Sequence, residues 1–118
     1  MDYDKLCNEI MKLDPLIRFV AILDKKGERV AGISHENISS LLNPDEVKMS
    51  QYYASRRWAA RGNLSHRIGG AKYSTTAYEK VKQITMPVSK TELLLISTEP
   101  SANQFQIIAQ ILKLIENN

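Results

Sequence analysis

Apolar residues recur along the chain in two periods, one typical of helices and one typical of strands. Helical spacing, with polar residues between the apolar ones, occupies about residues 3–13, 44–61 and 101–115. Short apolar or alternating runs predict strands at about residues 17–23, 28–33, 72–78, 81–88 and 92–98. The polar residues 34–40 predict a loop or a short helical turn. The predicted order is helix, two strands, helix, three strands, helix.

The middle helix has the clearest boundary signals. Asn43 is a suitable N-cap, Pro44 fits the first helical position, and Glu46 can reach back to the backbone of the cap. We expect this helix to end by Gly62 and Asn63, because both residue types tolerate the left-handed conformation that is common after helices.

The last helix has a similar start signal. Ser101 is predicted to be its N-cap, with Gln104 three residues later in the position of a capping box. Apolar residues at helical spacing then predict its buried stripe. That stripe consists of Phe105, Ile108, Ala109, Leu112 and Ile115.

Two of the strand runs, Phe19–Leu23 and Leu93–Ile96, are continuously apolar. A strand covered on both faces has this pattern, so these two strands are predicted to be central and adjacent. The spatial order of the strands is then 2-1-5-4-3. We expect one α/β (α+β) domain over residues 1–118, in which a five-stranded antiparallel sheet carries the second helix on one face and the first and third helices on the other.

Composition is that of an ordinary folded protein and constrains function weakly. The 118 residues are 43% apolar and 25% charged, and 16 basic against 13 acidic residues give a net charge of +3. This mixed balance permits attraction to nucleic acid or anionic lipid without requiring it. The single cysteine, Cys7, cannot form an internal disulfide, and no apolar run approaches the ~20 residues of a membrane span. We therefore expect a soluble, cytoplasmic protein.

The element order and two stretches of sequence carry a family resemblance. The first stretch is the hairpin IRFVAILDKKGERVA at residues 17–31, and the second is LLLISTEPSANQF at residues 93–105. Together they resemble the Roadblock family of dynein light-chain-like domains, which have a profilin-like architecture. The resemblance implies a divergent prokaryotic or archaeal member without enzymatic activity that forms homodimers through its second helix and third strand. It also implies a scaffold or regulator of small Ras-like GTPases or motor complexes.

The middle helix carries two apolar stripes, although a surface helix needs only one. The second stripe is predicted to pack antiparallel against the same helix of another copy about a two-fold axis. The polar edge strand at residues 73–78 would pair with its symmetry mate. The predicted dimer interface consists of Met49, Tyr52, Tyr53, Arg56, Ala60, Tyr73 and Thr75. The alternatives are that residues 34–42 fold over the stripe and that the edge strand is simply solvated.

Basic and aromatic residues alternate around the end of the middle helix. A phosphate or single-stranded nucleic acid could bind such a cluster, because basic side chains track the backbone while rings stack on bases. The candidate residues are Arg56, Arg57, Arg61, His66 and Arg67. Helical spacing spreads these side chains over several faces, and no recognised nucleic-acid-binding motif is present. A solvated surface is the preferred interpretation, with weak nucleic-acid binding as an alternative.

Catalytic and metal-binding patterns are missing from the sequence. His35, His66 and Cys7 are far apart and lack metal-ligand spacing. Asp24 is better explained by turn chemistry than by catalysis. We therefore predict no catalytic residue, no metal and no cofactor. A further alternative is a profilin-like ligand-sensing domain, which would need a closed pocket of several hundred Å³ between sheet and helix.

Overall fold

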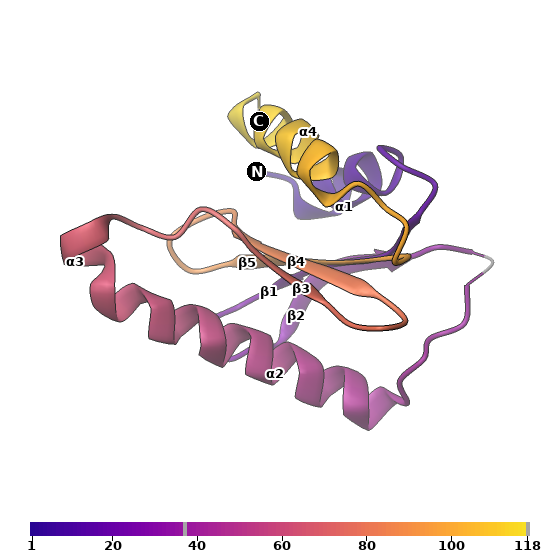
Figure 1. Ribbon diagram of the computed structural model, residues 1–118, viewed down its shortest axis with the longest axis horizontal. Coiled ribbons are helices and arrows are strands. Elements are labelled where there is room, and N and C mark those ends of the chain that lie inside the picture. The colour runs from indigo at the N-terminus through magenta and orange to yellow at the C-terminus, as the bar shows by residue number, and fades with distance from the viewer. Residues whose placement is uncertain (37, 118) are drawn as a thin grey trace.

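The predicted order of helices and strands is confirmed by the structure, a computed structural model that describes residues 1–36 and 38–117. Figure 1 shows the elements. They are α1 (Tyr3–Met11), β1 (Ile17–Leu23), β2 (Arg29–Ser34), α2 (Pro44–Arg61), the 3-10 helix η1 (Gly62–Leu64), α3 (Ser65–Ile68), β3 (Ser74–Ala77), β4 (Lys82–Pro87), β5 (Leu93–Thr98) and α4 (Gln104–Glu116). The described part of the predicted 34–40 loop contains no helix, and Asn37 lies outside the described residues.

The five strands form one antiparallel sheet in the order β2-β1-β5-β4-β3, as predicted. The two continuously apolar strands, β1 and β5, lie side by side at its centre. Leu95 of β5 pairs with Ala21 of β1 on one side and with Thr85 of β4 on the other. Strands β2 and β3 are the two edges, which matches their more polar sequences.

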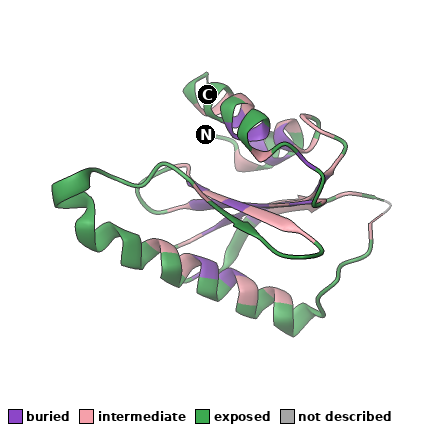
Figure 2. Cartoon of the chain, viewed as in Figure 1, coloured by how far each residue is buried: buried purple, intermediate pink, exposed green. Residues whose placement is uncertain are grey.

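Helices cover both faces of the sheet. Figure 1 shows α1 and α4 on one face and α2 on the other, which confirms the predicted layers. The main core lies beneath α1 and α4, where the sheet contributes Val20, Ile22, Leu94 and Ile96, all at 0% exposure. In Figure 2 buried residues concentrate between these layers, whereas α2 is buried only near its middle.

Helix α2 begins and ends as predicted, at Pro44 and Arg61. The Asn43 side chain accepts a hydrogen bond from the Glu46 backbone, and the Glu46 carboxylate accepts one from the Asn43 backbone, which completes a capping box. The expected left-handed conformation is absent from its C-cap, because Gly62 keeps right-handed helical angles (φ −62°) and the chain continues through η1 and α3. The left-handed region is instead occupied at Gly69 (φ 86°), the residue that ends α3.

The start and the buried face of α4 differ from the prediction. Asn103, not Ser101, is the N-cap, and its side chain accepts a hydrogen bond from the Gln106 backbone. The predicted stripe is also only partly correct. Of that stripe, Ile108 is buried and Ile115 is half-buried, but Phe105 (67% exposed), Ala109 and Leu112 face outward. The fully packed residues of α4 are Ile107, Ile108 and Ile111.

Candidate interaction surface

Helix α2 rests on the sheet through a short segment near its middle. Gln51 and Ala54 are buried there, at 5% and 2% exposure. One turn further along the helix, the Ser55 hydroxyl lies 3.4 Å from the carbonyl oxygen of Asp24 and 3.3 Å from that of Lys25, and donates to both. The β1–β2 turn therefore contacts α2 directly and holds it against the sheet.

The conformation of the β1–β2 turn depends on Asp24 and Gly27. The Asp24 carboxylate accepts hydrogen bonds from the backbone of Lys26 (2.9 Å) and Glu28 (3.0 Å), so its role in turn chemistry is confirmed. Gly27 has φ 83°, and a Cβ atom there would lie 2.8 Å from the Cα atom of Tyr52. Only glycine allows the turn to approach the helix this closely.

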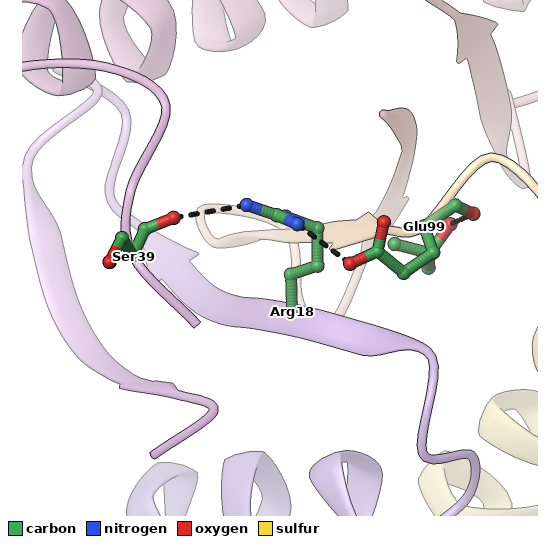
Figure 3. A network of polar contacts seen from close by, with 4 residues as sticks. Arg18, Ser39 and Glu99 are labelled. Atoms are coloured by element: carbon green, nitrogen blue, oxygen red, sulfur yellow. Dashed lines mark hydrogen bonds and ion pairs between the residues drawn. The ribbon is translucent and has the colours of Figure 1, made fainter. Parts of the chain in front are cut away.

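Arg18 of β1 holds the loop that leads into α2 by hydrogen bonds. Its guanidinium bonds to the Glu99 carboxylate at 2.7 Å and to the Ser39 carbonyl at 3.1 Å (Figure 3). A charge-assisted pair that is largely shielded from water is stronger than a surface pair. Because Glu99 lies 81 positions along the chain, no local pattern in the sequence indicates this contact.

The predicted second stripe of α2 is exposed. Met49 is 57% exposed and Tyr53 is 52% exposed, and Tyr52, Arg56 and Ala60 are also exposed. The rings of Tyr52 and Tyr53 meet edge to face, with their centroids 5.4 Å apart. The described loop residues, including Leu41 and Leu42, do not bury the stripe, which leaves it available to another molecule.

A groove of about 930 Å³ separates α2 from part of the sheet. Its floor includes Phe19 and Leu95, and its walls include Met49, Tyr53 and the loop at residues 38–42. The groove opens to solvent, so it differs from the closed pocket that a ligand-sensing domain would need. Met49 and Tyr53 belong both to the exposed stripe of α2 and to the lining of the groove, so the two features form one continuous surface.

Strand β3 is one of the two edges of the sheet. Its pairing with β4 matches Thr75 to Ile84, and no strand among the described residues lies on its outer side. Tyr73 and Thr75 are exposed. The edge is therefore open to strand addition.

The predicted basic cluster lies on the second half of α2 and on α3. All five of its members are exposed: Arg56, Arg57, Arg61, His66 and Arg67. The Arg61 guanidinium sits 5.8 Å from the centre of the Trp58 ring. The guanidinium therefore covers one face of the Trp58 ring.

Cys7 is a buried residue with an unreactive thiol. Burial, with a smaller contribution from Asp4, raises the pKa of the Cys7 thiol to about 11, which keeps it in the unreactive neutral form. Within residues 1–36 and 38–117 no three His, Cys, Asp or Glu side chains are placed to hold a metal ion. In the same residues no helix is long and apolar enough to cross a membrane.

One polar cluster that the sequence did not reveal joins α1 to the β4–β5 turn. The Glu92 carboxylate accepts hydrogen bonds from the hydroxyls of Thr91, Ser89 (2.7 Å) and Tyr3 (2.7 Å). These bonds lower the pKa of Glu92 from 4.5 to about 2. Its position on the α1 side of the sheet, away from the groove, indicates a structural role.

One protein-family model matches residues 1–117, and its description is "Family of unknown function (DUF6659)". The chain belongs to this family. No curated protein matches the sequence.

Solved structures match the fold closely. A Roadblock/LC7 domain from Streptomyces avermitilis is 13% identical, with 99% of this chain and 94% of that chain covered at a TM-score of 0.76. A structure titled "MglB with tetrameric arrangement" is 14% identical, with 94% and 79% covered at 0.77. Profilin IA from Acanthamoeba castellanii is 14% identical, with 98% and 95% covered at 0.54. The Roadblock-like and profilin-like resemblance is thereby confirmed at the level of the fold.

Proposed function

We propose that residues 1–118 act as one cytoplasmic, non-enzymatic module that forms a homodimer through α2 and β3. The observation that carries this proposal is the exposed stripe of α2 above an open groove. A second copy related by a two-fold axis would cover Met49, Tyr53 and Ala60 and would pair the exposed edge of β3.

Two further points support self-association. A structural neighbour with the same fold, MglB, has been solved in a tetrameric arrangement. The resemblance to Roadblock domains also implies a homodimer that uses the second helix and third strand. The exposed positions on both elements fit that expectation.

Sedimentation of the purified protein at micromolar concentration tests the dimer. The wild-type chain is expected to sediment as a dimer, and Tyr53→Glu as a monomer, because two carboxylates would be buried at the interface. Phe105→Glu on α4 is the matched control: it also replaces an exposed aromatic residue, but on the opposite face of the sheet, and should remain dimeric. A monomeric wild type, or a dimeric Tyr53→Glu, would contradict the proposal.

We further propose that the dimer regulates or scaffolds a small Ras-like GTPase, a step that rests on the Roadblock resemblance alone. The test is affinity capture from native lysate, with wild-type protein, Tyr53→Glu and Phe105→Glu as baits. A GTPase recovered with the two dimeric baits and lost with the monomeric one would support the step. Recovery of no GTPase with any bait would contradict it.

A further inference from the structure

The helical rod that begins with α2 ends in a segment that no other described residue of the chain covers. This segment, residues 62–68, comprises η1 and α3 and is called the arm below. Every residue of the arm is exposed, including Leu64 (59%) and Ile68 (79%). Figure 1 shows α3 projecting beyond the end of the sheet. Leu64 and Ile68 lie one helical turn apart, and adjacent exposed apolar side chains of this kind mark a candidate contact surface.

A second exposed apolar pair lies at the opposite end of the rod. Leu41 and Leu42 precede the N-cap of α2 and are 56% and 40% exposed. They also line the groove next to Met49. The rod therefore has an uncovered apolar pair at each end, with the exposed stripe of α2 between them.

The charges of the rod are also divided between its ends. Asp45 and Glu46 lie in the first turn of α2, whereas Arg61, His66 and Arg67 lie at its end and in the arm. Among the described residues, the two ion pairs are Lys5–Glu9 and Arg18–Glu99, so neither Asp45 nor Arg67 has an ionic partner. Two antiparallel rods would place Asp45 and Glu46 of each copy near the basic arm of the other, with Lys48 opposite Arg61 as the exception, whereas parallel rods would place like charges together at both ends.

We propose that the arm of each copy docks on residues 41–45 of the second copy, so that the homodimer is clamped at both ends of its paired helices. This inference rests on the proposed homodimer and deepens it. The predicted contacts on α2 run from Met49 to Ala60, so an antiparallel pair sets Ala60 beside the second copy's Met49. Two helical turns further on, Ile68 lies beside the second copy's Leu41, and Arg67 comes within reach of its Asp45.

A disulfide can report this contact between chains. Residues 44–68 span roughly 36 Å when helical, so Leu41 and Ile68 of one chain are too far apart to be bridged to each other. The double variant Leu41→Cys/Ile68→Cys is expected to form a covalent dimer under mild oxidation on a non-reducing gel. Each single variant, and the wild type with its buried Cys7, should remain largely uncrosslinked.

Charge reversal gives a second, independent measurement. Asp45→Arg and Arg67→Asp should each raise the dimer dissociation constant roughly 3- to 30-fold, because every dimer contains two such pairs. The double variant Asp45→Arg/Arg67→Asp should restore most of the affinity, since the swapped charges again attract. Lys113→Asp on α4 is the matched control and should leave the dissociation constant unchanged.

The outcomes separate this inference from the dimer proposal. A wild-type dimer that neither crosslinks through positions 41 and 68 nor responds to charge reversal would overturn the arm contact and leave the dimer standing. Strong crosslinking of either single variant would also overturn it, because like positions would then meet. A monomeric wild type would overturn the homodimer, and the arm contact with it.

Discussion

The two faces of the sheet differ in how completely the chain's own residues cover them. Among the described residues, the core beneath α1 and α4 contains fifteen buried residues, whereas the cluster facing α2 contains three, Ala21, Leu23 and Leu95. The same strands supply both faces, since neighbouring side chains point in opposite directions. The face beneath α1 and α4 is sealed within the chain, and the α2 face keeps an open groove. This difference is the reason why we place the proposed interface on the α2 side.

The largest expected effect is a difference in stability between variants of two adjacent leucines of β5, one on each face of the sheet. Leu94 faces the sealed core at 0% exposure, and Leu95 faces the α2 side at 3%. Leu94→Ala is expected to lower the free energy of unfolding by about 3–5 kcal/mol, because it leaves a closed cavity. Leu95→Ala should cost about 2 kcal/mol, since the space it leaves joins the groove. Urea denaturation of both variants at one protein concentration measures the difference, and equal costs would refute the comparison.

A second experiment tests how tightly α2 packs on the β1–β2 turn. It compares two glycines that both have a positive φ. Gly27→Ala combines backbone strain with a clash against the Cα atom of Tyr52 and should cost about 2–3 kcal/mol. Gly69→Ala has φ strain alone, because nothing lies within 4 Å of its added Cβ, and should cost about 1 kcal/mol. Thermal unfolding of the two variants gives the comparison. Equal costs would mean that α2 moves away from the turn without penalty.

The smallest expected effect is a pH dependence on the sealed side. Because the pKa of Glu92 is lowered to about 2 in the folded protein, its contribution to stability is present above pH 4.5 and is lost as the pH falls towards 2. Urea midpoints at pH 5 and pH 3 should therefore drop further for the wild type than for Glu92→Gln. Identical drops would show that the hydroxyl cluster does not stabilise the carboxylate.

The sheet order was predictable from sequence because burial on both faces leaves a direct pattern. The runs Phe19–Leu23 and Leu93–Ile96 mark strands that must lie inside the sheet. The buried face of α4 was harder to predict, because apolar residues occur at overlapping helical spacings along this helix and the pattern alone fits more than one face. The helical form of Gly62 was missed because glycine adopts right- and left-handed angles with similar ease.

The candidate interface was predictable only in part. A surplus apolar stripe on α2 is visible in the sequence, and the structure leaves its members exposed. The groove and the Arg18–Glu99 pair were not predictable, since they depend on segments distant in sequence that only the completed fold brings together.

The central pairing of β1 with β5 has a consequence for the timing of folding. About 70 residues separate Leu23 from Leu93, and ribosomes add roughly 5–20 residues per second, so β1 emerges roughly 4–14 s before its partner strand. Contacts so distant along the chain also slow folding. During synthesis the apolar run from Phe19 to Leu23 therefore lacks the partner strand β5, and an apolar strand with an unpaired edge is prone to aggregate.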